Sequence, residues 1–290
     1  MLGRAVMRAA PPAWQVTAVR HADLDITDAA ALQSRMNTDA PDWVINCAAF
    51  TRVDAAESDS LAMQVNGDAP GLIGAVAAVS RARVLHISTD YLFDGTLGRP
   101  YREDDAPNPL SAYGRSKLAG ERGLLASGAD SLIVRTQWLY GEGGPSFVAT
   151  MRSRALGALP VRVVRDQRGA PTNADDLAAM LWRLVQADAR GIVHATAGGE
   201  ASWYDVAREV YQLLGAAAAL VTPCTTAEYA HGMRGERASA PRPLAPRPLA
   251  PRTLAPRPLD GRLDTARYVA LTGHDPVPWA IGLRRFLAAG

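Results

Sequence analysis

The stretch that decides the fold is VLHISTDY at residues 84–91, which the segment YGRSK follows at residues 113–117. Residues 84–87 form an apolar run typical of a strand, and the run ends in hydroxyl and carboxyl side chains. Tyr113 and Lys117 stand four residues apart, a spacing that places both side chains on one face of a helix. The sequence therefore predicts a polar strand end that faces a helix carrying a Tyr–Lys pair.

This Tyr–Lys pair suits proton transfer. A tyrosine hydroxyl has a pKa of about 10, and a neighbouring cation lowers that pKa because it favours the phenolate. Tyr113 beside Lys117 becomes a usable general acid, and a hydroxyl from Ser88 or Thr89 could hold the same substrate oxygen. The same spacing is also common on solvated helix faces with a half-buried tyrosine, so the pair alone leaves both interpretations open.

Short apolar runs alternate with helical patterns through the first two thirds of the chain. This alternation predicts an α/β fold with a doubly wound parallel sheet. The expected strands are residues 16–19, 43–46, 84–87 and 132–135, and the expected helices are residues 29–36, 69–79, 111–125 and 201–214. Ligands of such sheets bind at the carboxyl ends of the strands, where Asn46, Ser88, Thr89 and Arg135 stand.

Composition excludes several classes of protein. Of the 290 residues, 48% are apolar and 21% are charged, which is typical of a globular chain with roughly two domains. The net charge of +2 gives no basis for nucleic-acid binding, and no stretch approaches the ~20 apolar residues of a membrane span. Cys47 and Cys224 fit neither a metal site nor a disulfide framework, and they favour a reduced cytoplasmic setting.

Several linked segments resemble the extended short-chain dehydrogenase/reductases and, more narrowly, the dTDP-4-dehydrorhamnose reductases. The similar segments are residues 46–57, 65–66, 84–95, 113–121, 135–141, 166–172, 203–205, 257–259 and 263–264. They follow one another in the family's order over nearly the whole chain, and several motifs in sequence are far more specific than one. Gln137 and Gly261 depart from the pattern, because each replaces a serine that the family usually carries.

The resemblance implies reduction of the 4-keto group of dTDP-4-dehydro-β-L-rhamnose with hydride from NADPH or NADH. Tyr113 would be the acid, Lys117 its partner and ribose ligand, and Thr89, with Ser88 as second choice, the group that polarises the carbonyl. The expected cofactor-binding residues are Gly3, Asp25, Asn46, Ala48, Ala49, Ser88, Tyr113 and Lys117. The expected substrate-binding residues are Thr89, Asp90, Trp138 and Arg257. No metal is expected, since Arg4 and Ala5 fall where some relatives carry a metal-linked acid.

Two of these residues have a second interpretation. Trp138 could stack on the sugar or base, or it could serve in packing. His86 is tempting as a base, but within an apolar strand a packed core histidine is the better interpretation. The implied partner is a dTDP-sugar, without nucleic acid or membrane, and a homodimer is left open. Rival functions are another nucleotide-sugar reductase or epimerase, and a non-catalytic regulatory subunit such as that of methionine adenosyltransferase.

The front of the chain departs from the family, which opens with a strand and a Gly-x-x-Gly-x-x-Gly turn. Residues 1–8 match the last glycine, Gly3, and the helix after it. The sheet is therefore expected to lack its first strand, and part of the pyrophosphate cradle with it. Three explanations stand: a translation start assigned downstream of the true one, a truncated product that binds cofactor poorly, or an arginine-containing targeting peptide.

The domain boundaries follow from the same comparison. Residues 1–140 are expected to form the dinucleotide-binding domain, with residues 161–196 packing back onto it. Residues 141–160 and 197–290 are expected to form a smaller substrate domain. Within it, residues 240–259 repeat an Ala-Pro-Arg-Pro-Leu unit, and proline at this density predicts an extended polyproline II conformation. Alternatively, the repeat is a docking segment for a proline-binding module. Arg257 is the expected phosphate-binding arginine of this loop.

Overall fold

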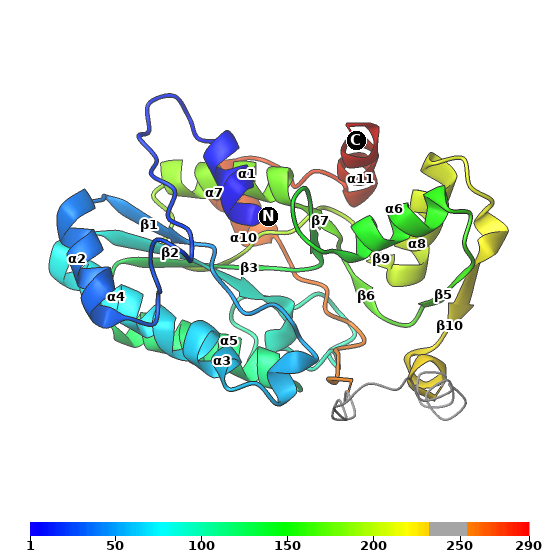
Figure 1. The fold of residues 1–290 in the computed structure, drawn as a ribbon, viewed down its shortest axis with the longest axis horizontal. Coiled ribbons are helices and arrows are strands. Elements are labelled where there is room, and N and C mark those ends of the chain that lie inside the picture. Colours follow the sequence, from blue (N-terminus) through cyan, green and yellow to red (C-terminus); the bar gives the residue numbers. More distant parts are fainter. Residues whose placement is uncertain (232–253, 290) are drawn as a thin grey trace.

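A sheet of four parallel strands forms the centre of the computed structural model, which describes residues 1–231 and 254–289 (Figure 1). The strand order is β1-β2-β3-β8, and neighbours are parallel throughout. The strands are β1 Trp43–Asn46, β2 Arg83–Thr89, β3 Ser131–Thr136 and β8 Gly191–His194. Parallel neighbours need crossover connections, and helices supply them on both faces. The predicted α/β fold with a doubly wound parallel sheet is confirmed.

Alternation along the strands divides the core into two layers. Leu85 of β2 and Leu132 of β3 face one layer, whereas their neighbours Val84 and Ile133 face the other, as the period of two in a strand requires. The helices that cover the first layer are α1 Leu2–Arg8, α7 Ala174–Gln186 and α10 Ala266–Thr272. The helices of the second layer are α2 Ala29–Asp39, α4 Ala69–Ser80 and α5 Ala112–Ala126.

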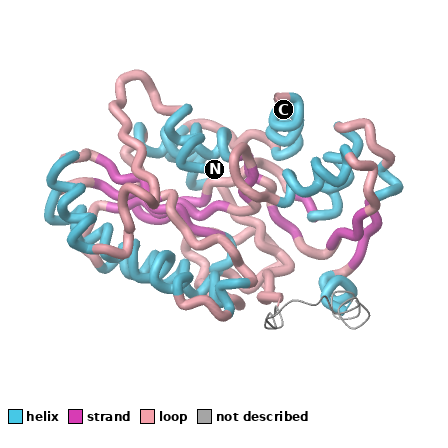
Figure 2. The backbone as a smooth tube through the Cα atoms, viewed as in Figure 1, coloured by secondary structure: helices cyan, strands magenta, loops and turns pink. Residues whose placement is uncertain are grey.

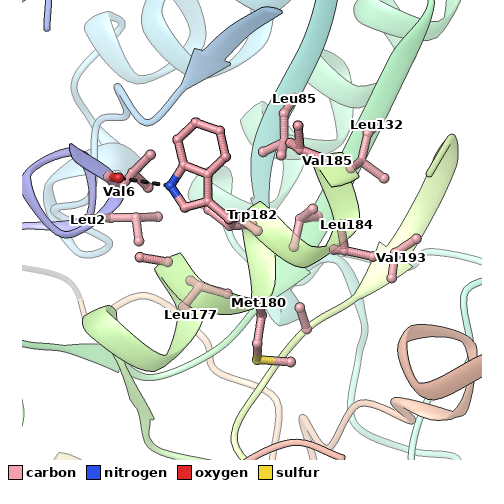
Figure 3. Packing of buried hydrophobic residues seen from close by; sticks show 14 of the residues in the cluster. Leu2, Val6, Leu85, Leu132, Leu177, Met180, Trp182, Leu184, Val185 and Val193 are labelled. Atoms are coloured by element: carbon pink, nitrogen blue, oxygen red, sulfur yellow. Dashed lines mark hydrogen bonds between the residues drawn. The ribbon is translucent and has the colours of Figure 1, made fainter. Parts of the chain in front are cut away.

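The first layer anchors the amino-terminal helix. Figure 3 shows Trp182 of α7 lying between Leu2 and Val6 of α1 on one side and the sheet residue Leu85 on the other. The indole N–H of Trp182 donates to the carbonyl oxygen of Val6 at 2.9 Å. Burial of large apolar side chains, together with this satisfied indole, holds α1 against α7 and the sheet.

The predicted strand at residues 16–19 does not form. These residues have no regular secondary structure, and Val19 is exposed. A strand needs a neighbour to accept and donate its backbone hydrogen bonds. Among the described residues, β1 pairs with β2, and residues 16–19 pair with neither. The apolar pattern of residues 16–19 was therefore not sufficient for a strand.

A second core lies beyond the carboxyl ends of the sheet strands, on the right in Figures 1 and 2. Its main elements are α6 Phe147–Leu156, β5 Val161–Val164, α8 Trp203–Leu213, β10 Val221–Cys224 and α11 Trp279–Ala288. The short elements are β4 Leu139–Tyr140, β6 Arg168–Gly169, β7 Thr172–Asn173, β9 Ala201–Ser202, α3 Leu61–Met63, the π-helical turn η2 Gln64–Asp68, and the 3-10 turns η1 Ala55–Glu57, η3 Asp90–Leu92 and η4 Ala218–Leu220.

The two cores place the domain boundaries differently from the expectation in two segments. Residues 161–164 were expected to pack on the sheet, but β5 pairs with β10 because Val161 and Val163 bury against the second core. Residues 266–272 were assigned to the substrate domain, but Tyr268 of α10 is buried against α7 and β8. In the proline-rich loop, residues 254–258 have no regular secondary structure, and the expectations for residues 240–253 lie outside the described residues.

Candidate active site

The carboxyl ends of β2 and β3 bring together buried polar atoms that have no partner. Ser88 pairs in register with Arg135, and Thr89 pairs with Thr136. Among the described residues, the buried side-chain oxygens of Ser88, Asp90 (Oδ2), Thr136 and Gln137 (Oε1) lack a hydrogen-bond partner. Buried polar groups are normally satisfied, and in an open parallel sheet this edge is where ligands bind. The edge therefore has the character of a ligand site.

Tyr113 lies beside this edge because α5 approaches it closely. The side chain of Ser111 caps the helix by accepting the N–H of Gly114. At Gly114 an added Cβ would lie 2.2 Å from the carbonyl oxygen of Tyr91, so glycine is what permits this approach. The ring of Tyr113 meets that of Tyr91 edge to face, with 5.4 Å between centroids.

Thr89 contacts the phenol of Tyr113. Burial raises the pKa of Tyr113 above its ordinary value, and hydrogen bonding from Thr89 opposes that rise. The hydroxyl of Thr89 also donates to Asp90 Oδ1 at 3.1 Å. The structure thus brings together Tyr113, Thr89 and Asp90, three of the residues named from sequence.

Asp90 is a buried carboxyl group whose Oδ2 has no hydrogen-bond partner within residues 1–231 and 254–289. Burial raises its pKa to about 7, and the hydrogen bond from Thr89 acts in the opposite direction. An added Cβ at Gly261 would lie 2.6 Å from Asp90 Oδ2. Glycine at position 261, where the family usually has serine, therefore leaves room beside an unpartnered acceptor.

Lys117 lies one turn after Tyr113 and is buried, and its amine faces β2. Its Nζ donates to the carbonyl oxygen of Ile87 at 2.6 Å and lies 3.1 Å from His86 Nε2. Burial lowers the pKa of Lys117 to about 8, whereas the nearby Glu121 acts to raise it. The groups that act on the pKa of Tyr113 are Thr89, Asp90 and Tyr91. The amine is therefore held by β2 and not by the phenol.

A buried ion pair fastens α5 to the sheet. Glu121 accepts from Arg135 through both carboxylate oxygens, at 2.9 and 2.7 Å, and both side chains are 2% exposed. The bidentate geometry fixes the helix along its axis relative to β3. Sequence reasoning placed Arg135 at a strand end but did not identify Glu121, because two ordinary charged residues far apart in sequence give no local signal.

Arg257 reaches the same edge from the far end of the chain. Its guanidinium donates to Asp54 Oδ1 and to the carbonyl oxygen of Ala255, each at 2.9 Å. It also interacts with the hydroxyl of Tyr91, whose pKa burial raises to about 12. The arginine expected to meet the nucleotide phosphates is thus placed beside Tyr91, the ring that contacts Tyr113.

Trp138 is engaged in packing. Its ring stacks on Trp203 with 3.6 Å between centroids and 12° between planes. Its φ is +47°, a left-handed conformation that is uncommon for a residue other than glycine and costs free energy. An added Cβ at Gly169 would lie 2.6 Å from this ring, so glycine at position 169 makes room for it. The structure shows Trp138 packed on Trp203, and its contact with the substrate stays a prediction.

The other residues expected to bind the cofactor differ in their exposure and in their hydrogen bonds. Gly3 lies against Cys47, just after the end of β1. Asn46 accepts the N–H of Ala48 at its Oδ1 and faces His86 with its Nδ2, so its amide is already engaged. Ala48 is exposed beyond that strand end, and its neighbour Ala49 is partly exposed. Asp25 is exposed, and its Oδ1 accepts hydrogen bonds from the backbone N–H and the hydroxyl of Thr27 in a local turn.

Two residues contribute more than the sequence suggested. His86 is buried, as expected of a core histidine, but its two ring nitrogens face Asn46 and Lys117. Asn66 joins three segments, since it accepts the N–H of Phe50, donates to the carbonyl oxygen of Phe50 and donates to Ser116.

The composition of the chain singles out Lys117, which is its only lysine. Every other basic side chain apart from the histidines is an arginine.

Neither metal ligands nor a membrane span were found in the part of the chain that the structure describes. Residues 1–231 and 254–289 contain no group of three or more His, Cys, Asp or Glu placed to hold a metal ion. No helix within those ranges is long and apolar enough to cross a membrane.

Comparison with known proteins decides the family. The model of the RmlD substrate binding domain matches residues 1–245. The chain belongs to the RmlD substrate binding domain family. A family relative from Streptomyces griseus, a dTDP-4-dehydrorhamnose reductase, is 46% identical over 219 residues, which cover 73% of this chain and 72% of that protein. A dTDP-4-keto-6-deoxy-D-glucose reductase from Streptomyces niveus is 44% identical over 161 residues, which cover 55% of this chain and 56% of that protein. The chain spans about half the length of several curated relatives that it matches.

Solved structures in the RmlD family share the fold. The dTDP-4-dehydrorhamnose reductase of Clostridium acetobutylicum superposes with a TM-score of 0.86 at 36% identity, over 99% of this chain and 95% of that one. The dTDP-4-dehydrorhamnose reductase of Bacillus anthracis, solved in complex with NADP, gives a TM-score of 0.87 at 28% identity, over 100% of this chain and 95% of that one. The resemblance inferred from sequence segments is therefore confirmed at the level of family and fold.

Proposed function

We propose that this chain reduces the 4-keto group of dTDP-4-dehydro-β-L-rhamnose to the alcohol of dTDP-L-rhamnose, with NADPH or NADH as the hydride donor. The observation that carries the proposal is the meeting of Tyr113 and Thr89 beside unpartnered buried oxygens at the carboxyl edge of the sheet. Family membership supports it, since relatives named for this reaction match most of the chain.

The residues present fit a nicotinamide dinucleotide at this edge. The unpartnered oxygens of Ser88 and Thr136 would be satisfied by polar groups of a bound ligand. The amine of Lys117 donates to the carbonyl oxygen of Ile87, the residue before Ser88 on β2. Ala48 and Ala49 follow the end of β1 and would line the adenosine side, with Gly3 beyond them. When bound, the cofactor supplies the hydride for the carbonyl carbon.

The chain's own residues manage the proton. Tyr113 holds its proton firmly, because burial raises the pKa of the phenol, and it can give that proton to a substrate oxygen as negative charge develops there. Thr89 opposes the rise that burial causes in the pKa of the phenol, and its hydroxyl would polarise the same oxygen. A charged Lys117 would lower the pKa of Tyr113 and assist the transfer. Asp90 and Arg257 would contact the sugar and the phosphates of the nucleotide.

A second substrate is supported by one specific observation. The relative from Streptomyces niveus is named for dTDP-4-keto-6-deoxy-D-glucose, which differs from the first substrate in the sugar and not in the bond reduced. The residues described above act on the carbonyl and the nucleotide, so they serve both substrates. The experiment must therefore distinguish which of the two sugars is the substrate.

The test is an assay of nicotinamide oxidation with the purified chain and each of the two 4-keto sugars, with the product identified by mass spectrometry and NMR. Turnover of dTDP-4-dehydro-β-L-rhamnose with NADPH or NADH is expected, and Tyr113→Phe is the matched inactive control. Preference for dTDP-4-keto-6-deoxy-D-glucose would establish the alternative. Tight dinucleotide binding without reduction of either sugar would overturn the proposal in favour of a non-catalytic role.

The proposal also covers the cellular compartment and the oligomeric state. Cys47 and Cys224 are both free thiols, which suits the reduced cytoplasm. Burial raises the pKa of both thiols, so neither is expected to react readily. A homodimer stays within the proposal, and light scattering of the purified chain tests it.

A further inference from the structure

His86 lies between two side chains that determine where its proton sits. Its Nδ1 is 3.1 Å from Asn46 Nδ2, and its Nε2 is 3.1 Å from Lys117 Nζ. All three side chains are buried. Because His86 lies on the face of β2 that α5 covers, the ring connects the end of β1 with the centre of α5.

The backbone of Ala48 fixes the direction of this chain of hydrogen bonds. The N–H of Ala48 donates to Asn46 Oδ1 at 3.0 Å. A backbone N–H can only donate, so the amide oxygen must occupy that position and the amide NH2 must face His86. His86 Nδ1 therefore accepts a hydrogen bond and carries no proton.

The ring proton of His86 then sits on Nε2 and points at Lys117. Burial and the neighbouring Lys117 hold the pKa of His86 well below its ordinary value, so the ring is neutral and has one N–H. An ammonium group has three donors and no acceptor, whereas a neutral amine has a lone pair. The arrangement is satisfied when Lys117 is a neutral amine that accepts from His86 and donates to Ile87.

The surroundings of Lys117 are consistent with an amine that changes its charge. Burial lowers the pKa of Lys117, and the opposing carboxylate, Glu121 of α5, is itself neutralised by Arg135 of β3. The other titratable groups around it are His86 on β2 and Tyr113 one turn earlier on α5. An arginine cannot lose its proton in a protein, and position 117 is the one place where this arginine-rich chain uses lysine.

We propose that His86 is a positioning residue that controls the proton on Lys117. When Lys117 is neutral in the ligand-free protein, His86 Nε2–H donates to its amine. When the site takes up a proton, the Nε2 proton passes to Lys117, the incoming proton binds His86 Nδ1, and the Asn46 amide turns so that its oxygen accepts from Nδ1. Ala48 N–H then loses its acceptor and is free for a ligand.

This switch links ligand binding at the end of β1 to the charge beside Tyr113. A ligand that accepts the N–H of Ala48, an exposed residue, favours the turned amide and hence the charged Lys117. The catalytic consequence rests on the proposed function, because there the charged Lys117 assists Tyr113. The proton arrangement itself does not depend on any activity.

The first experiment measures the tautomer in the unmodified chain. Long-range nitrogen–proton NMR of protein with labelled histidine, recorded at a pH well above the pKa of Lys117, resolves which ring nitrogen carries the proton for each of the five histidines. His86 is expected as the Nε2–H tautomer, and its signals are assigned by their loss in His86→Phe. A proton on Nδ1 in the ligand-free protein would overturn the proposal without any variant needing to fold.

The second experiment measures the pKa of Lys117. Labelled lysine gives one side-chain signal, because the chain has one lysine. His86→Phe keeps a flat ring but removes the hydrogen bond between the ring and the amine in both charge states. The bond to the ammonium is the stronger of the two, so the pKa of Lys117 should fall by about one unit, a tenfold loss of proton affinity. An unchanged pKa, or a rise, contradicts the proposal, because the ring would then not be a hydrogen-bond partner of the charged amine.

The third experiment reverses the relay. Asn46→Asp replaces the amide NH2 by an acceptor, so His86 should move its proton to Nδ1 and Lys117 should become charged. The added negative charge raises the pKa of Lys117 by itself, and the tautomer of His86 is therefore the deciding readout. His194, a buried histidine on β8, serves as the internal control and should keep its tautomer. An unchanged His86 tautomer would overturn the relay, whereas absent turnover with the expected NMR results would overturn only the proposed function.

Discussion

Arg257 and Asp54 form an ion pair, with 2.9 Å between Nη2 and Oδ1, that fastens the last unit of the proline-rich repeat to the loop after β1. The guanidinium also donates to the carbonyl oxygen of Ala255, so it is already engaged in the ligand-free chain. A nucleotide phosphate that uses Arg257 must therefore compete with the carboxylate of Asp54. This competition gives the pair a measurable effect on substrate binding.

Arg257→Ala should raise KM for the dTDP-sugar roughly 10- to 100-fold, because a charge-assisted hydrogen bond to an ionised group is worth about 1.5–3 kcal/mol. Asp54→Asn should lower KM, since it removes the competing carboxylate. Steady-state kinetics measures both. Arg102→Ala is the matched control, because its side chain is exposed and its ion pair with Asp264 is long at 3.8 Å. Equal KM values in all four proteins would separate Arg257 from the nucleotide.

Tyr113→Phe should reduce kcat roughly 10²- to 10⁴-fold, the usual value of general acid catalysis. Dinucleotide affinity and the thermal unfolding curve should stay close to those of the parent, because the ring and its contact with Tyr91 remain. Tyr91→Phe is the control, since it removes a neighbouring phenol that is not assigned the proton. A Tyr113→Phe protein with more than half the parent kcat would exclude Tyr113 as the acid.

Asp90 should make stability depend on pH in an unusual direction. Its folded pKa of about 7 exceeds the unfolded value of 3.8, so the folded state holds the proton more strongly. The contribution of Asp90 is therefore fully favourable below pH 3.8 and is lost as the pH rises through about 7. Since one pKa unit is about 1.4 kcal/mol, this loss could reach about 4 kcal/mol.

Asp90→Asn isolates this effect. Between pH 4.5 and pH 8, its free energy of unfolding should fall less, or rise more, than that of the parent, as urea titrations at ~0.5-unit intervals would show. Asp25→Asn is the control, because Asp25 is exposed and its pKa is lowered and not raised. Parallel pH profiles for parent and Asp90→Asn would show that Asp90 is ionised throughout this range.

Glu121→Gln should destabilise the chain by about 3–5 kcal/mol, because it leaves the buried guanidinium of Arg135 without its counter-charge. Replacing both partners, as in Glu121→Leu with Arg135→Met, should recover most of that loss, since neither charge then remains buried. Asp39→Asn breaks the exposed pair with Arg35 and should change the free energy of unfolding by under about 0.5 kcal/mol. Chemical denaturation measures all three, and a cost for Glu121→Gln as small as that for Asp39→Asn would contradict the assignment.

Sequence reasoning succeeded where the pattern is local. The apolar runs at residues 43–46, 84–87 and 132–135 became β1, β2 and β3, because each lies between two helical layers. The helix predicted at residues 111–125 became α5, and the i,i+4 pair does lie on that one helix. These features depend on neighbours along the chain, so the sequence contains the necessary information.

The failures depend on partners distant in sequence. Residues 16–19 have the composition of a strand, but no adjacent strand pairs with them in the described structure. The amine of Lys117 turned toward His86 because the two side chains meet between α5 and β2, and the simple i,i+4 argument considered only the helix.

The burial of the only lysine provides a way to measure how often this part of the protein opens. A protease that cleaves after lysine has one target bond within the chain, and 1% of the Lys117 side chain is exposed in the fold. Cleavage therefore requires α5 to separate from β2. Digestion should yield two fragments, residues 1–117 and 118–290, at a rate that reports how often the reacting edge of the sheet opens.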